Sequence, residues 1–195
     1  MVEPKENCDI IQLWSEDGTN RLTRACVLSL ANAIQELARS PRPLIITGNQ
    51  KFFSTGADLN EITALTGPEA LAFSKAGQLM TDAVDEFPDL VIAAVSGYCM
   101  GGGLDLALAC DHRIASPHAI FGHRGAALGL ITGWGGTQRL ARRIGPARAV
   151  EMFVPAEKLD ATRALRCRLV DRVCDDPLSE AIRCVEHRSL AVPIC

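Results

Sequence analysis

Three consecutive glycines, Gly101–Gly103, stand where an apolar stretch passes into a helical one. The first N–H groups of a helix have no partner within that helix and carry partial positive charge. Glycine also allows a ligand atom to approach the backbone closely. This junction can therefore bind a carbonyl oxygen that becomes negative during a reaction. The alternative interpretation is that the glycines only form a tight turn.

Ionisable side chains that could transfer a proton follow the glycines. Asp105 could act as a general acid or base, or it could simply favour the first turn of a helix. His123 belongs to the residue type that exchanges protons near neutral pH, and Arg124 to the type that binds carboxylates and phosphates. For both, the alternative is a position at the surface or in the anchoring of a loop.

Strands and helices alternate along the chain, and they must position these residues. Apolar runs bounded by turn residues predict strands at residues 10–14, 44–48, 90–95 and 112–115. Helical spacing predicts helices at residues 23–39, from a capping Thr66 with Glu69, and at 133–143, 146–153, 160–168 and 177–191. Phe52–Leu59 is predicted to be a loop. The alternation predicts an α/β fold with largely parallel strands.

The composition is that of a globular protein of one domain, with or without an appendage. The chain has 195 residues, of which 48% are hydrophobic and 22% charged. The net charge of −3, without a block of Lys and Arg, indicates neither nucleic acid nor an anionic membrane as partner. The polar segment Met1–Glu6 does not resemble a targeting peptide, and no apolar run approaches the ~18 residues of a membrane span. We therefore expect a soluble, cytoplasmic protein.

The eight cysteines raise the question of a metal site or of disulfides. No pair of them has C-x-x-C spacing. Cys26 and Cys110 stand in apolar surroundings, where a free cysteine behaves as a small hydrophobic residue. We predict reduced structural thiols and no metal site.

Three motifs together resemble the crotonase (enoyl-CoA hydratase/isomerase) superfamily: Phe53–Leu59, Ser96–Ala107 and Gly129–Leu140. Their order and spacing match that family, and the similarity runs from about residue 10 to about residue 185. The resemblance implies an α/β spiral of ββα turns with two nearly perpendicular sheets. It divides the chain into a core at 1–145 and a shortened C-terminal helical region at 146–195. The family's C-terminal helices mediate trimer formation, so a homotrimer or hexamer is expected.

The resemblance also implies a substrate and an oxyanion hole. In the family, an acyl-CoA thioester places its carbonyl oxygen between two backbone N–H groups, which here are those of Ala57 and Gly102. These donors stabilise an enolate-like intermediate. Coenzyme A is then part of the substrate, and no separate cofactor is expected. The substrate-binding positions implied by the motifs also include Gly56, Asp58, Leu59 and Gly101. In the family, the adenine of CoA lies against the backbone of the loop that here contains Ala57, Asp58 and Leu59.

The chain departs from the family's pattern at both catalytic glutamates. The first is replaced by Asp105, whose carboxylate is one methylene shorter and is withdrawn by about 1.5 Å. The second position is occupied by Gly125, which has no side chain to transfer a proton. Reactions that need one carboxylate, such as double-bond isomerisation or decarboxylation, are therefore favoured over efficient hydration. The alternative is a non-catalytic acyl-CoA-binding member or a partner subunit.

Trp134 stands where relatives usually have a small residue, and either walls the acyl pocket or fills core space.

Two other classes of protein are excluded. Neither Ser54 nor Ser96 lies in the G-x-S-x-G elbow of a serine hydrolase. Gly97–Gly101 lacks the G-x-G-x-x-G spacing of a dinucleotide-binding turn.

Overall fold

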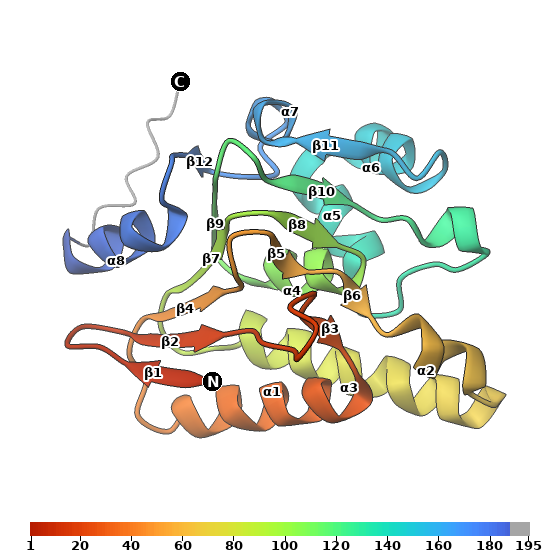
Figure 1. Cartoon of the computed structure of the whole chain (residues 1–195), viewed down its shortest axis with the longest axis horizontal. Helices are drawn as coiled ribbons and strands as arrows, with labels where there is room; N and C mark the ends of the chain where they lie inside the picture. Colours follow the sequence, from red (N-terminus) through yellow and green to blue (C-terminus); the bar gives the residue numbers. More distant parts are fainter. Residues whose placement is uncertain (188–195) are drawn as a thin grey trace.

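The protein is described by a computed structural model that covers residues 1–187, with the strands in three sheets (Figure 1). The largest sheet has the order β1-β2-β4-β7-β9-β12, the second has the order β11-β10-β8-β5, and the smallest pairs β3 with β6. The strands are β1 (Val2–Pro4), β2 (Asp9–Gln12), β3 (Arg21–Leu22), β4 (Leu44–Thr47), β5 (Phe52–Ser54), β6 (Gly56–Ala57), β7 (Val91–Val95), β8 (Tyr98–Met100), β9 (His112–Ala115), β10 (Ile120–Gly122), β11 (Lys158–Asp160) and β12 (Arg172–Val173).

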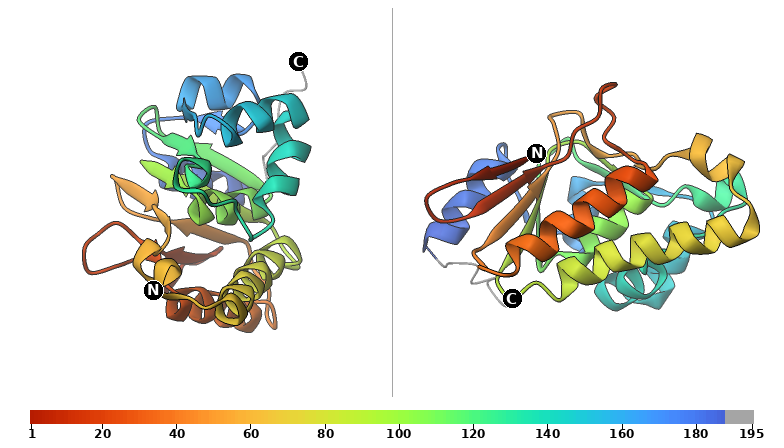
Figure 2. Two further views of the ribbon diagram at one scale, coloured as in Figure 1. Left: turned by 90° about the vertical axis from the view of Figure 1, so that its right-hand side faces the viewer. Right: turned by 90° about the horizontal axis from the view of Figure 1, so that it is seen from below.

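Helices cover both faces of the six-stranded sheet. Helices α1 and α3 lie side by side on one face, and α8 lies on the other (Figures 1 and 2). The helices are α1 (Arg24–Leu37), α2 (Leu59–Ala64), α3 (Gly67–Asp85), α4 (Gly102–Ala109), the 3₁₀ turn η1 (Gly125–Leu128), α5 (Gly136–Ile144), α6 (Pro146–Phe153), α7 (Ala161–Arg166) and α8 (Pro177–His187).

The chain advances by repeating one unit, a strand in each of the two larger sheets followed by a helix. β4 leads to β5, β7 leads through β8 into α4, and β9 leads through β10 toward α5. Successive units pair in parallel, with β4 beside β7 and β7 beside β9 in one sheet, and β5 beside β8 and β8 beside β10 in the other. This arrangement is the predicted spiral of ββα turns. It places the ends of β8 and β10 next to each other, where the glycine turn and His123 stand.

The central strands are apolar on both faces because both faces are covered. Leu44 and Ile46 of β4 point into the core shared with α1 and α3, whereas Ile45 packs with residues of α8. All residues of β7 are buried as well. A strand covered on both sides needs apolar residues at every position, which is why these two strands were the easiest to predict from the sequence.

Capping and breaker residues define the helices where they were expected. Thr66 and Glu69 form a reciprocal capping box at the start of α3.

The predicted loop at Phe52–Leu59 was wrong, since this segment contains β5, β6 and the first residue of α2. Strands of two or three residues are too short to show a periodicity and owe their pairing to distant segments. The helix expected from residue 133 begins at Gly136, and residues 188–191 of the last predicted helix lie outside the described residues.

A buried ionic cluster ties β9 to the segment before β12. Asp171 accepts a 2.9 Å hydrogen bond from the Arg113 N–H and pairs with the Arg143 guanidinium. The Arg113 side chain is itself buried and donates to the Leu169 carbonyl at 2.8 Å. Burial alone would raise the pKa of Asp171. The nearby His112 side chain, the Arg113 N–H hydrogen bond and the guanidinium charges together outweigh burial and lower that pKa from 3.8 to about 2.

Among residues 1–187, no helix combines the length and the apolar character that crossing a membrane requires.

Beyond residue 146 the chain continues to build on the core, because β11 pairs antiparallel with β10. The division of the chain at residue 145 stays a prediction.

Candidate functional site

The glycine turn joins β8 to α4 at the centre of the molecule (Figure 1). Gly101 has φ +52°, and Gly56 of the facing strand β6 has φ +88°, so both backbones adopt conformations that favour glycine. A Cβ added at Gly56 would lie 2.8 Å from the Gly102 nitrogen and 2.6 Å from the Met100 carbonyl oxygen. Strand β6 therefore contacts the start of α4 without room for a side chain. The fold brings the predicted Ala57 and Gly102 segments together.

The N–H groups of Ala57 and Gly102 are both free of local acceptors. The Asp58 N–H donates to the Leu22 carbonyl of β3 at 3.3 Å. In a parallel strand, the N–H groups of alternate residues point toward the same neighbour. The Ala57 N–H therefore points away from β3. Gly102 is the first residue of α4, where N–H groups have no intrahelical acceptor. Within residues 1–187, neither N–H donates to a loop carbonyl or a side chain. Two free donors on touching segments are consistent with the oxyanion hole that the sequence predicts, and that role stays a prediction.

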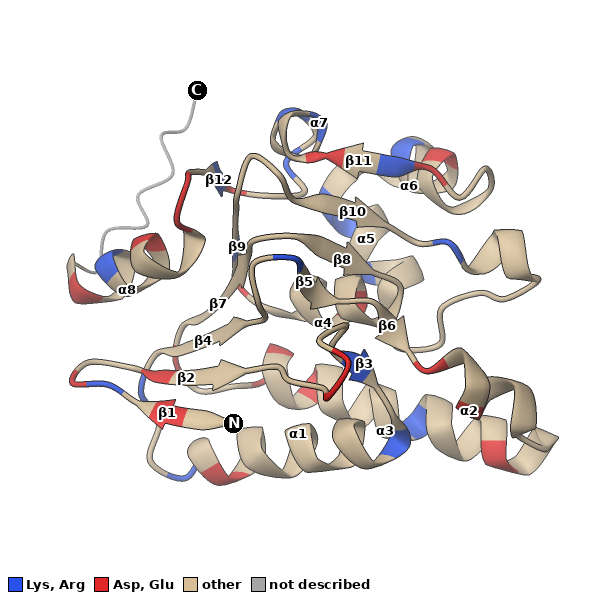
Figure 3. Cartoon of the chain, in the orientation of Figure 1, with Lys and Arg blue, Asp and Glu red and all other residues tan. Residues whose placement is uncertain are grey.

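Asp105 and His123 meet in the protein interior next to this turn. The Asp105 side chain is 1% exposed and the His123 side chain 4%, and Asp105 Oδ1 lies 3.2 Å from His123 Nε2. The alignment of the two groups is not that of a hydrogen bond, so both atoms retain capacity for a further partner. Asp105 is the single charged residue of α4 (Figure 3). Its carboxylate faces His123 rather than the N–H groups of the helix, and the His123 side chain is buried rather than at the surface.

The segment after His123 has no second carboxylate. Arg124 is exposed and precedes η1, and the 3₁₀ turn begins at Gly125. A Cβ added at Gly125 would come within 2.7 Å of the Leu130 carbonyl oxygen. A side chain at this position would therefore require a shift of backbone, and His123 is the ionisable group that reaches Asp105 from this segment.

Trp134 fills the space between α3 and α4. It is 5% exposed, and a Cβ added at either Gly77 of α3 or Gly102 of α4 would overlap its indole. Phe73 packs edge-on against it, with ring centroids 5.4 Å apart. Trp134 is thus a core residue that borders the backbone of Gly102, and its role as a wall of the acyl pocket stays a prediction.

Sequence reasoning missed two residues that contact Asp105: Thr132, in the loop before α5, and Gly136, the first residue of α5. The Thr132 hydroxyl donates to Asp105 Oδ2, and a Cβ added at Gly136 would overlap Asp105 Oδ1. The available signal was a hydroxyl residue inside the glycine-rich motif Gly129–Leu140. Nothing in the sequence alone showed that this hydroxyl reaches the carboxylate.

Asp58 and Leu59 lie at the start of α2. Asp58 caps that helix by accepting from Asn60 N–H at 2.8 Å, and it pairs with Arg21 at 3.1 Å, whereas the Leu59 side chain is largely exposed. A cavity of about 270 Å³ adjoins Asp58. Its other lining residues are Ser15, Glu16, Asp17, Arg21 and Thr23.

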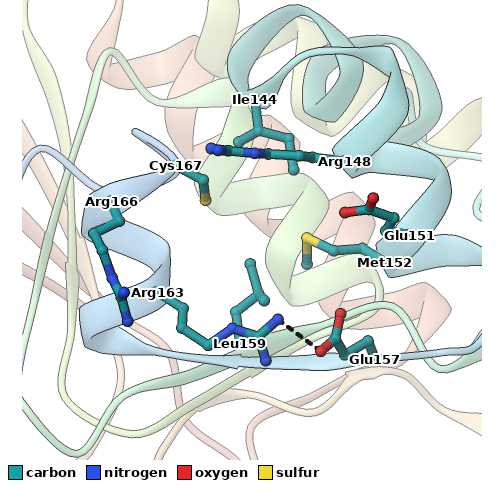
Figure 4. Close-up of a pocket in the computed structure, with 9 residues that line it drawn as sticks. All are labelled: Ile144, Arg148, Glu151, Met152, Glu157, Leu159, Arg163, Arg166 and Cys167. Atoms are coloured by element: carbon teal, nitrogen blue, oxygen red, sulfur yellow. Dashed lines mark ion pairs between the residues drawn. The ribbon is translucent and has the colours of Figure 1, made fainter.

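A second cavity, of about 280 Å³, lies between α6, β11 and α7, away from the glycine turn (Figure 4). Met152 and Leu159 are among its lining residues, as are Arg163 and Glu157, which form an ion pair of 2.7 Å. None of its lining residues is one that the sequence singled out. In the described part of the chain the cysteines are free thiols, and no three His, Cys, Asp or Glu side chains gather as metal ligands would.

The similarity to known proteins covers nearly the whole chain. Residues 3–191 match the model of the enoyl-CoA hydratase/isomerase family. A probable enoyl-CoA hydratase of Mycobacterium leprae is 39% identical over 188 residues, which cover 93% of this chain and 71% of that protein. A crotonyl-CoA hydratase of Syntrophomonas wolfei is 35% identical over 176 residues, covering 89% of this chain and 68% of that protein.

Solved structures agree with this assignment. DspI of Pseudomonas aeruginosa superposes with a TM-score of 0.92 at 34% identity, covering 96% of this chain and 78% of that one. An enoyl-CoA hydratase from Bacillus anthracis superposes with a TM-score of 0.91 at 33% identity, covering 96% and 75% of the respective chains. The motifs, the ββα spiral and these matches agree, and the chain belongs to the enoyl-CoA hydratase/isomerase family.

Proposed function

We propose that this protein isomerises a double bond in an acyl-CoA thioester by moving a proton from the α carbon to the γ carbon. The thioester oxygen accepts hydrogen bonds from the Ala57 and Gly102 N–H groups, which stabilise the enolate formed when the α proton leaves. Asp105 carries the proton, and His123 shares it. The observation that supports this most directly is the 3.2 Å separation of Asp105 Oδ1 and His123 Nε2, both buried beside the glycine turn.

The geometry favours isomerisation over hydration. Hydration requires two groups that hold a water molecule between them, and a water bridging two polar atoms keeps them well beyond direct contact. Asp105 Oδ1 and His123 Nε2 are already in contact, so they form one acid–base unit. A single unit suffices to remove a proton at one carbon and return it at another. Decarboxylation of a carboxylated thioester would use the same enolate, with Arg124 available to bind the carboxylate.

One further feature supports a substrate with a short acyl group. A thioester carbonyl bound at the Gly102 N–H places its acyl carbons near Trp134, whose indole contacts the backbone of Gly102. A long chain would have to displace this buried ring. The nucleotide end of CoA would extend along Ala57–Leu59, beside the cavity that adjoins Asp58.

The decisive experiment incubates the protein with a short 3-enoyl-CoA in D₂O. It follows the formation of 2-enoyl-CoA and the incorporation of deuterium into the thioester. The proposal predicts 2-enoyl-CoA formation together with deuterium at the α or γ carbon, detected by mass spectrometry. Crotonyl-CoA is tested in parallel for hydration. Hydration faster than isomerisation would overturn the assigned reaction.

The matched control is Asp105→Asn, which keeps the shape of the side chain but cannot carry the proton. Loss of both isomerisation and deuterium uptake in this variant is expected. CoA binding by calorimetry with no turnover and no deuterium uptake in the native protein would instead establish the non-catalytic alternative. That alternative rests on the same missing carboxylate at Gly125.

A further inference from the structure

The Asp105 carboxylate is held on two sides by one segment of the chain. The Thr132 hydroxyl donates to Oδ2, and the Cα of Gly136 faces Oδ1 so closely that no Cβ would fit. The third neighbour, His123, approaches Oδ1 at 3.2 Å from the end of β10. The carboxylate therefore has one oxygen in a hydrogen bond and the other turned toward the acid–base partner.

The direction of the Thr132 hydroxyl is set by a second contact. Trp134 N–H donates to Thr132 Oγ1 at 3.4 Å. A hydroxyl has a single hydrogen, and when its oxygen accepts from an N–H, that hydrogen is directed to another acceptor. Here the other acceptor is Asp105 Oδ2, so the Trp134 N–H directs the Thr132 hydroxyl hydrogen toward the carboxylate.

The segment that carries Thr132 is itself anchored to α3. The Gly133 carbonyl accepts from Gln78 Nε2 at 2.8 Å and from Ser74 Oγ at 3.1 Å. The Trp134 carbonyl accepts from Thr81 Oγ1 at 3.1 Å. Thr132 is thus fixed to a long helix that packs in the core, which restricts how far its hydroxyl can move.

We propose that Thr132 is the positioning residue of the Asp105 carboxylate, an inference that rests on the proposed role of Asp105 as proton carrier. It holds Oδ2 so that Oδ1 stays between His123 and the substrate carbon. An aspartate has a shorter reach than a glutamate, and a misplacement of about 1 Å can cost on the order of 100-fold in rate. The Thr132 hydroxyl acts on the rate through Asp105 and does not touch the reacting atoms.

The test compares Thr132→Val, which removes the hydroxyl at nearly constant shape, with Thr132→Ser, which keeps it. The isomerisation kcat of Thr132→Val is expected to fall about tenfold or more with KM within about twofold, and Thr132→Ser restores most of the rate. Thr63→Val, at an exposed position of α2, is the control for a threonine-to-valine change elsewhere. Equal rates for Thr132→Val and the native protein would overturn the inference.

A second readout does not depend on turnover. The ring nitrogen resonances of His123, one of four histidines, report the placement of Asp105 in the unliganded protein. Thr132→Val should shift them at constant pH, whereas Thr132→Ser and Thr63→Val should leave them in place. If the native protein isomerises no thioester but the resonances shift as expected, the proposed function fails and the positioning contact stands. If the resonances are unchanged in Thr132→Val, the positioning role itself is refuted.

Discussion

Asp105 Oδ1 and His123 Nε2 lie 3.2 Å apart although the two residues come from different turns of the spiral. Asp105 stands in the first turn of α4, and His123 follows β10 directly. Because β8 and β10 are parallel neighbours, the residues that follow these strands emerge at the same edge of the sheet. The contact is therefore a product of the spiral, and it places a second ionisable group where the motif alone supplies a shortened carboxylate.

Replacing His123 tests the partnership. His123→Gln retains a polar side chain of similar reach, but its amide cannot accept a proton and pass it on as an imidazole can. We expect the isomerisation kcat to fall by about 10²-fold or more, in the range for a general acid–base group. Steady-state kinetics with a short 3-enoyl-CoA measures this. The imidazole also packs on the Phe153 ring, with ring centroids 4.9 Å apart. Thermal unfolding of the variant therefore serves as the control for folding. An unchanged kcat would show that Asp105 works alone.

Gly136→Ala should disturb Asp105 from the opposite side. The new Cβ would overlap Oδ1, and the carboxylate cannot retreat without leaving Thr132 or His123. Overpacking of a buried site typically destabilises by about 1–3 kcal/mol, and kcat should fall as well. Gly67→Ala is the matched control, since a Cβ at that position meets no atom within 4 Å. Urea unfolding and isomerisation rates of the two variants would decide, and the expectation fails if both behave alike.

Trp134→Phe should widen the range of acyl chains. The smaller ring vacates part of the space beside Gly102 and Gly77 that the indole now fills. Each methylene accommodated in a hydrophobic pocket is worth about 1–3 kcal/mol of discrimination. The ratio of kcat/KM for an octenoyl thioester to that for a butenoyl thioester should therefore rise by about tenfold. A ratio that stays constant would mean that Trp134 is only a core residue.

Arg124→Ala tests substrate binding. The Arg124 side chain is exposed and follows His123, so its guanidinium can reach a phosphate of CoA or a carboxylate on the substrate. Its loss should raise KM about tenfold with little change in kcat, because the binding is the same in the ground state and the transition state. Kinetics at low and high salt separates a charge effect from a shape effect. A fall in kcat at constant KM would point to a different role.

Acid should weaken the fold through Asp171. Its pKa is lowered to about 2 in the folded protein from 3.8, so the ionised form stabilises the fold above about pH 4, and this contribution is lost as the pH falls toward 2. The contribution is on the order of 1 kcal/mol once solvent screening is considered. Asp171→Asn should therefore lower stability at neutral pH, and its difference from the native protein should shrink near pH 3. Urea unfolding across this range measures it. Asp175→Asn, at an exposed position, is the control and should show no such convergence.

Much of the fold could be read from local patterns. The continuous apolar runs of β4 and β7 reflect strands buried on both faces, and the capping box at Thr66 marks the start of α3. The glycine triplet marked the helix start at Gly102, which follows a residue with a positive φ at Gly101. These features depend on neighbours in the chain, so the order of residues is enough to reveal them.

The arrangement around Asp105 was decided by the tertiary structure. Thr132 stands 27 residues from Asp105, and its hydroxyl reaches the carboxylate only because the loop before α5 is anchored to α3. The pairing of β6 with β3, which frees the Ala57 N–H, likewise depends on contacts between distant segments. The sequence by itself determined the family, the spiral and the glycine turn before α4. Which side chains surround the Asp105 carboxylate depends on how distant segments pack together, and a local sequence pattern does not show this packing.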